Sequence, residues 1–181
     1  MNLESLRHSC SHVLASAVKK LYPEAKLGIG PAIEEGFYYD FEMPEKLSEE
    51  DLPKIEKMMK KEIEAGFDFI QQEWDKDKAL DFFKEKGEKY KIEIINDLGQ
   101  DKVSLFKHND FIDLCKGPHL ENTKFLKNFK LLTVSGAYWR GNEKNSQLSR
   151  IYGTVFPDKK SLKKYLNKLE EAKKRDHRKL G

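Results

Sequence analysis

The sequence predicts an α+β fold, in which a mixed or antiparallel sheet packs in two layers with helices and a helix trails at the carboxyl end. Three observations support this class. Short stretches with strand-like alternation are interspersed with segments of helical periodicity, the aromatic residues supply the area of a core, and no internal repeat divides the chain. Over 181 residues we expect one main domain at 1–156 and a basic linker helix at 157–181.

Four segments have the pattern of an amphipathic helix, with an apolar residue at every third or fourth position. Start signals such as Ser48, followed by three acidic residues, and stop signals such as Gly66 and Gly87 delimit them. The helices are expected at residues 3–21, 48–65, 76–86 and from 158 onward.

Strands are expected where apolar residues alternate or form short runs between turn residues. In one of them Tyr38 and Tyr39 point to opposite faces, so only one of the two can lie in the core. The expected strands are residues 27–31, 36–42, 67–74, 90–95, 103–107, 110–114, 130–135 and 150–156.

Composition and charge exclude several classes of protein. No apolar run reaches the roughly 20 residues that a membrane helix needs, so no membrane contact is expected. With only two cysteines a disulfide framework is not expected, which places the protein in a reducing cytoplasm. The net charge of +3 is too small for bulk packaging of nucleic acid but leaves room for a local basic patch. The basic segment 173–179 is either a solvated helix end or a contact for phosphate.

Two pairs of side chains with four-residue spacing stand out as a candidate site. His8 and His12 lie one turn apart on the first helix, on the face opposite its apolar stripe. Cys115 and His119 have the same spacing but enclose Gly117-Pro118, which places them on a loop. Imidazole and thiolate groups suit metal binding, nucleophilic chemistry or proton transfer near neutral pH.

The spacing alone leaves three interpretations open. The four side chains could hold one tetrahedral Zn²⁺. They could instead line a metal-free hydrolytic pocket, with a histidine as the general base and Cys115 as a polar wall. The third interpretation is a structural cluster, and on its own the first helix could simply turn His8 and His12 toward water.

Three further residues carry signals that remain ambiguous from the pattern. His108 falls at a turn and is predicted to be exposed, and Lys91 falls on a predicted strand, where a lysine ordinarily reaches solvent. The aromatic and basic turn around Trp139 is either a ligand clamp or a packed hairpin with the indole in the core.

Several motifs together resemble the amino-terminal editing domain of bacterial-type threonyl-tRNA synthetases, over essentially the whole chain. The two histidine and cysteine pairs are also shared with the editing domain of alanyl-tRNA synthetases and with free-standing relatives, whereas Ser135-Gly-Ala-Tyr-Trp-Arg-Gly141 and Arg175-Asp-His-Arg-Lys-Leu-Gly181 select the threonyl type. The remaining motifs are Arg7-His-Ser-Cys-Ser-His12, Gly36-Phe-Tyr-Tyr-Asp40, Asp113-Leu-Cys-Lys-Gly-Pro-His119 and Arg150-Ile-Tyr-Gly-Thr154.

The resemblance implies hydrolysis of the ester in tRNA for threonine that has been mischarged with serine. A synthetic site sized for threonine cannot strongly exclude serine, because one methyl group is worth only about 1–3 kcal/mol of discrimination. The threonyl type works without zinc, so no cofactor is expected. Zinc at His8, His12, Cys115 and His119 belongs to the alternative reading as an alanyl-type or free-standing deacylase. The non-enzymatic alternative is a tRNA-binding module with a vestigial cluster.

Catalytic roles are implied for three residues. His8 and Lys91 match the family residues that position and activate the hydrolytic water, and Lys91 follows Gly87-Glu-Lys-Tyr90 as it does in the family. This implication replaces the solvent-facing interpretation of Lys91. His12 is expected to complete the catalytic group.

Substrate contacts are implied for four residues. Asp113 matches the carboxylate that holds the α-ammonium of the seryl group, and Cys115 and His119 wall its side chain. Tyr39 is expected beside the terminal adenosine, where an exposed aromatic residue such as Tyr38 or Tyr39 could stack on a base. The expected partner is the CCA-3′ seryl-adenosine end of tRNA.

The resemblance also implies missing parts. The family has a small domain before this region, and a catalytic core and an anticodon-binding domain after it. We therefore expect the rest of a synthetase chain as a partner and Leu180-Gly181 as a cut rather than a natural end. This fragment alone is not expected to bind ATP or form threonyl-adenylate.

Overall fold

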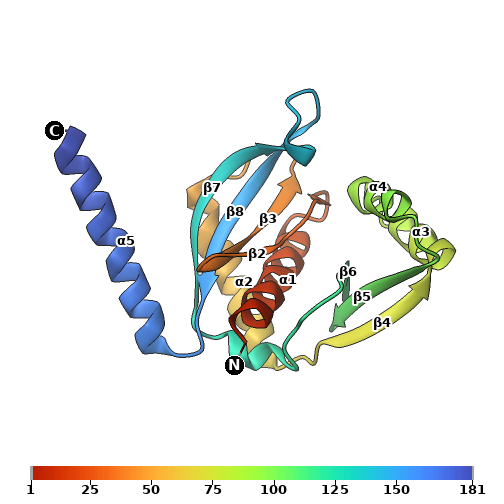
Figure 1. Cartoon of the computed structure of the whole chain (residues 1–181), viewed down its shortest axis with the longest axis horizontal. Helices are drawn as coiled ribbons and strands as arrows, with labels where there is room; N and C mark the ends of the chain where they lie inside the picture. Colours follow the sequence, from red (N-terminus) through yellow and green to blue (C-terminus); the bar gives the residue numbers. More distant parts are fainter. Residues whose placement is uncertain (1, 181) are drawn as a thin grey trace.

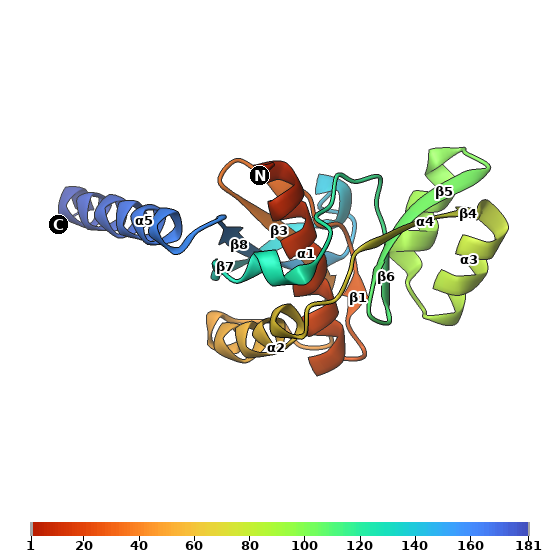
Figure 2. The same cartoon turned by 90° about the horizontal axis from the view of Figure 1, so that it is seen from below.

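The first helix, α1 (Leu3–Leu21), lies between two antiparallel sheets in the computed structural model, which describes residues 2–180 and the side chains of residues 2–178 (Figures 1 and 2). The helix begins where the side chain of Asn2 accepts a hydrogen bond from the Ser5 amide at 3.1 Å. Most of its apolar stripe is buried, as the predicted amphipathic helix requires, whereas Leu3 at its start is exposed. The predicted α+β class is confirmed.

The first sheet holds the larger core. Strands β1 (Lys26–Leu27), β3 (Gly36–Glu42), β8 (Gln147–Val155) and β7 (Phe129–Tyr138) follow one another across it, and β2 (Ala32–Ile33) also pairs with β3. Helices α1 and α2 (Leu52–Ala65) pack on one face, where Phe37, Tyr39 and Phe41 are buried. Tyr38 points to the other face and is half-buried, so the prediction that one tyrosine of the pair is core is confirmed.

The second sheet is smaller and lies on the other side of α1 (Figure 2). It has the order β4 (Ile70–Asp75), β5 (Lys102–His108) and β6 (Phe111–Leu114). Helices α3 (Lys76–Glu85) and α4 (Lys89–Leu98) belong to the same part of the chain, and their apolar residues form a core of their own with β5, around Phe83, Ile95 and Leu105. The second sheet therefore has a smaller hydrophobic core of its own beside the larger core of the first sheet.

The predicted strand at residues 90–95 is wrong, because this segment is the helix α4. Tyr90, Ile92 and Ile94 alternate as in a strand, but the buried residues are Tyr90, Lys91 and Ile95, a spacing that puts all of them on one side of a helix. The helix ends at Gly99, whose φ of +62° favours glycine. Tyr90 and Ile94 pack on Trp139 and Leu148, so this helix also touches the first sheet.

The remaining predictions are mostly confirmed, although the strands differ in length: those predicted at 103–107, 130–135 and 150–156 are longer than expected, and others are shorter. The strand predicted at 27–31 ends at Leu27, although the Gly28 amide still donates to the Asp40 carbonyl at 2.7 Å. The strand predicted at 67–74 begins only at Ile70. Short 3-10 turns complete the chain, namely η1 (Glu49–Asp51), η2 (Thr123–Leu126) and η3 (Trp139–Gly141).

The last helix, α5 (Lys159–Leu180), extends away from the two sheets (Figure 1). Its existence confirms the predicted helix from residue 158, while the division into domains 1–156 and 157–181 stays a prediction. None of the helices within residues 2–180 has both the length and the apolar character that crossing a membrane requires.

Candidate active site

A hollow of about 330 Å³ opens beside α1, where the two sheets approach each other. The loop at residues 29–32 closes one side and Ile94 of α4 another. The remaining lining comes from α1, α4, β6 and the loop after β6, namely Glu4, His8, His12, Lys91, Asp113, Leu114 and Gly117. Four of the sequence-predicted site residues therefore reach one hollow.

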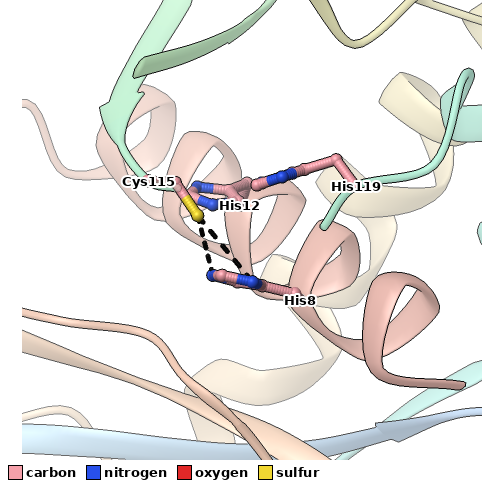
Figure 3. A group of neighbouring side chains, drawn as sticks. All are labelled: His8, His12, Cys115 and His119. Atoms are coloured by element: carbon pink, nitrogen blue, oxygen red, sulfur yellow. Dashed lines mark hydrogen bonds between the residues drawn. The ribbon is translucent and has the colours of Figure 1, made fainter. Parts of the chain in front are cut away.

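The two predicted pairs converge into one cluster (Figure 3). His8 and His12 stack on α1 with ring centroids 5.3 Å apart, as their four-residue spacing requires. Cys115 and His119 arrive on the loop after β6, and the His8 Nε2 and Cys115 Sγ atoms lie 3.0 Å apart. The ligand atoms of the four residues all lie within 4.8 Å of one another. The interpretation in which His8 and His12 simply face water is wrong, since His12 is buried and His8 half-buried.

The position of His119 is fixed by packing. The loop turns at Gly117, whose φ of +91° favours glycine. The ring of His119 then stacks on Phe106 of β5, with centroids 3.5 Å apart. Among the described residues neither ring nitrogen of His119 has a hydrogen-bond partner. The imidazole therefore presents unsatisfied nitrogen atoms within the cluster.

Asp113 organises the floor of the site. Its side chain is 1% exposed, and its two oxygens accept four hydrogen bonds. Oδ2 accepts from His12 Nδ1 at 2.9 Å and from the Tyr39 hydroxyl at 2.6 Å. Oδ1 accepts from its neighbour's amide, Leu114 N, at 2.8 Å and from Lys91 Nζ at 2.7 Å. The carboxylate thus joins strand β3, helices α1 and α4, and strand β6.

Lys91 is buried and paired, contrary to the solvent-facing interpretation of its strand pattern. Its ammonium group also donates to the Tyr39 hydroxyl, at 2.9 Å, so two of its three N–H bonds have partners among the described residues. Burial of such a cation is tolerable because the Asp113 carboxylate lies against it.

Tyr39 takes part through its hydroxyl group alone. Its side chain is fully buried, and the backbone of Gly30 lies directly on the ring, where a Cβ atom would come within 2.0 Å of it. Stacking of a base on this ring is therefore excluded, which corrects that part of the sequence-based expectation. Tyr39 instead bridges Lys91 and Asp113 beneath the hollow.

The electrostatic environment gives His12 and Asp113 opposite charges at neutral pH. Burial lowers the pKa of His12, but the adjacent Asp113 carboxylate outweighs it and raises this pKa to about 9. Burial raises the pKa of Asp113, whereas Lys91 and His12 together hold it well below its usual range. His12 is therefore a cation and Asp113 an anion at neutral pH.

Two further members of the cluster, Cys115 and His119, both have a lowered pKa. Burial raises the pKa of the Cys115 thiol, but the imidazoles of His119, His12 and His8 lower it to about 4. Burial lowers the pKa of His119 to about 4. The cluster therefore combines a thiolate and a neutral imidazole at neutral pH.

His108 does not belong to the site, and its predicted exposure is wrong. It is 2% exposed, and its Nε2 atom lies 3.5 Å from an oxygen of Glu62, a buried carboxylate on α2 that also accepts from Ser16. The turn after β5 is exposed, but the imidazole points back toward α1 and α2. Only tertiary structure reveals this, because Glu62 lies 46 residues earlier in the chain.

The lining residues that the sequence reasoning missed include Glu4 and Ile94. Glu4 precedes His8 by four residues, so the helical spacing that linked His8 with His12 also places Glu4 on that face. Ile94 follows Lys91 by one helical turn, a signal that the incorrect strand assignment concealed.

The indole of Trp139 is buried and donates to Glu93 at 2.8 Å, which supports the packed-hairpin interpretation of its turn.

Comparison with known proteins connects this geometry with a family. Residues 103–152, which include Asp113, Cys115 and His119, match the model of the "Threonyl and Alanyl tRNA synthetase second additional domain". The chain is also 56% identical over 99% of its length to a "Threonine--tRNA ligase" of Citrifermentans bemidjiense, and 55% identical to that of Geobacter sp. strain M21. Residues 103–152 therefore belong to the second additional domain family, and the whole chain is similar to one segment of threonine--tRNA ligases.

The threonine--tRNA ligases that match this chain are much longer than it is. The chain spans 28% of the length of these two relatives, and the same share of a threonine--tRNA ligase from Lawsonia intracellularis that is 56% identical.

Proposed function

We propose that the chain hydrolyses the ester bond of tRNA for threonine that carries serine, releasing serine and free tRNA. The observation that carries the proposal is the convergence of His8, Lys91 and His12 on one hollow, in a chain whose relatives are threonine--tRNA ligases. A ligase of this kind needs such a step, since one methyl group gives only about 1–3 kcal/mol of discrimination at the first site.

The hydrolytic step uses His8 and Lys91 to place and activate water. The imidazole of His8 is half-buried at the edge of the hollow, and the ammonium of Lys91 is held at its floor. Water attacks the ester carbonyl carbon and gives its proton to the imidazole as general base. The carbon–oxygen bond to the ribose then breaks, and the ribose oxygen leaves with that proton.

His12 stabilises the negative charge that develops on the carbonyl oxygen. Its Nδ1 atom donates to Asp113, and its Nε2 atom has no partner among the described residues. Because the pKa of about 9 keeps the ring protonated, Nε2 also carries a hydrogen, which can donate to the oxyanion. Lys91 supplies the second positive charge through its remaining N–H bond.

The substrate's amino and hydroxymethyl groups have separate contacts in this proposal. Asp113 is the counter-charge for the α-ammonium of serine, and one of its four present donors has to give way when that group binds. Cys115 and His119 form the wall beside the serine side chain. The stacking of His119 on Phe106 makes this wall rigid, so that an additional methyl group meets resistance.

We expect seryl-tRNA for threonine to be hydrolysed at least about tenfold faster than threonyl-tRNA, the lower end of the discrimination that one methyl group allows. The measurement compares release of labelled serine and threonine from the same tRNA transcript at equal enzyme concentration. Equal rates for the two esters would contradict the serine pocket, and the absence of hydrolysis of either would contradict the enzymatic function.

A zinc-dependent deacylase is the second candidate, because the four donor atoms also fit a metal. Tetrahedral zinc with bonds of about 2.0–2.3 Å needs donor separations of about 3.3–3.8 Å, so the side chains, now within 4.8 Å, would have to close in modestly. His8, His12, Cys115 and His119 would hold the ion, which would supply a Lewis acid. We favour the metal-free site, since the cations Lys91 and His12 already balance its anions.

Metal analysis separates these two candidates. We expect the purified chain to contain much less than one zinc per molecule, and treatment with a chelator to leave ester hydrolysis unchanged. One tightly bound zinc per chain that is absent from the His8→Ala variant, together with loss of hydrolysis on chelation, would establish the zinc-dependent enzyme instead. Elemental analysis by mass spectrometry provides the stoichiometry.

A further inference from the structure

Charge is distributed very unevenly between α5 and the rest of the chain. Residues 159–180 contain ten of the 34 Lys and Arg residues but only three of the 31 Asp and Glu residues. They therefore carry a net charge of +7, while the rest of the chain carries −4. The overall charge of +3 is therefore the sum of a basic helix, α5, and an acidic remainder of the chain, which we call the body.

The basic residues of α5 share one face of the helix. At about 100° per residue, the apolar positions fall on one side and most of the basic positions on the opposite side, interrupted by Glu171. The apolar positions are half-buried, whereas the basic ones are exposed. We define the basic face of α5 by Lys160, Lys164, Lys168, Lys174, Arg175 and Arg178.

These charges have little compensation within the molecule. Among the described side chains of α5, the one ion pair is between Lys168 and Glu35, at 4.0 Å. Closer pairs occur elsewhere in the chain, as in the bidentate contact of Arg150 with Asp40 at 2.8 and 3.0 Å. A row of positive charges, most of them unpaired among the described side chains, over about 33 Å of helix, the length of 22 residues at 1.5 Å each, suits a row of phosphates.

The base of α5 is coupled to the segment that carries the candidate catalytic residues. Tyr165 of α5 packs on Phe156, with ring centroids 5.4 Å apart. The guanidinium of Arg7 lies 5.5 Å from the centre of the same Phe156 ring, and His8 follows Arg7 on α1. A polyanion held along α5 would thus be anchored close to the hollow, while Figure 1 shows the helix reaching outward from that point.

We infer that the basic face of α5 binds the phosphate backbone of tRNA and supplies most of the affinity of this chain for it. The inference rests on the proposed function only for the identity of the nucleic acid, because the charge distribution itself indicates a polyanion. The body, with its net charge of −4, contributes recognition of the terminal ester but repels the remaining phosphates.

The test measures binding of an unacylated tRNA transcript to the whole 181-residue chain over a series of salt concentrations. The variant combines Lys160→Gln, Lys164→Gln and Arg178→Gln. We expect its dissociation constant to rise at least about tenfold at low salt, and the slope of log K against log salt to fall by about 2 to 3, because three phosphate contacts are lost.

A second variant controls for net charge. It combines Lys57→Gln, Lys60→Gln and Lys61→Gln, which are exposed on α2 and remove the same charge. This variant should bind tRNA within about twofold of the parent. Circular dichroism should show unchanged helix content for both variants, since glutamine preserves helix propensity.

Three outcomes would overturn the inference. The α5 variant could bind tRNA as the parent does, the two triple variants could weaken binding equally, or the chain could bind anionic phosphatidylserine vesicles more tightly than tRNA. Hydrolysis of a minimal ester, seryl-adenosine, keeps this test apart from the proposed function. The α5 variant should hydrolyse it at the parental rate, whereas a parent that binds tRNA but leaves seryl-adenosine intact would refute the esterase and not the basic face.

Discussion

Replacing His8 by alanine is expected to slow hydrolysis of seryl-adenosine by about 10²- to 10⁴-fold, the usual contribution of a general base. The structure gives the reason, because the imidazole of His8 is half-buried and, unlike that of His119, lines the hollow. His12 already donates to Asp113, and burial holds the pKa of His119 at about 4, which makes it a weak base.

Single-turnover kinetics on the minimal ester provide the measurement, since they isolate the chemical step from binding of the tRNA body. His177→Ala is the matched control, because that histidine is exposed on α5 and lies outside the hollow. It should retain the parental rate. If the His8 variant also retained it, His8 would not be the base and the assignment of the site would fail.

The second large effect concerns stability. Asp113→Asn should lower the free energy of unfolding by about 3–5 kcal/mol, because it leaves the buried Lys91 ammonium without its counter-charge. The ammonium and carboxylate are 3% and 1% exposed and lie 2.7 Å apart, and protonated His12 loses the same partner. Urea denaturation followed by circular dichroism gives the difference directly.

A double variant tests the cause of that loss. Adding Lys91→Met to Asp113→Asn removes the orphaned charge and should restore most of the stability, although not the activity. Asp75→Asn is the control, because the ion pair of Asp75 with Lys102 is exposed and should leave the free energy of unfolding unchanged. An Asp113→Asn variant as stable as the parent would show that the pair is not electrostatically coupled.

The sequence predicts four of the five α-helices correctly, and it predicts the fifth, α4, as a strand because the pattern of its segment is ambiguous. α1, α2 and α3 have long periodic patterns together with capping residues or terminal glycines. The segment 90–95 is too short to decide, because its apolar residues satisfy a period of two as well as a helical turn. The wrong choice also hid the direction of Lys91, which only the resemblance to a known family corrected.

The convergence of the two pairs was predicted from spacing, but their surroundings were not. A four-residue repeat on a helix determines which side chains stack, so His8 and His12 were identifiable from the sequence alone. The contacts of Asp113 with Tyr39 and Lys91 join residues 74 and 22 positions apart, and no local pattern encodes such partners. The predicted exposure of His108 is wrong for the same reason, since its burial depends on the distant residue Glu62.

The residues of the site come from two parts of the chain. Elements α1 and β3, which pack in the first sheet's core, contribute His8, His12 and Tyr39. Helix α4, strand β6 and the following loop, which belong to the part with the second sheet, contribute Lys91, Asp113, Cys115 and His119. Chemistry therefore exists only in molecules whose two halves are docked. A substitution far from the hollow that lets the smaller half detach for part of the time would reduce turnover in proportion to the undocked fraction, without altering any group that touches the ester.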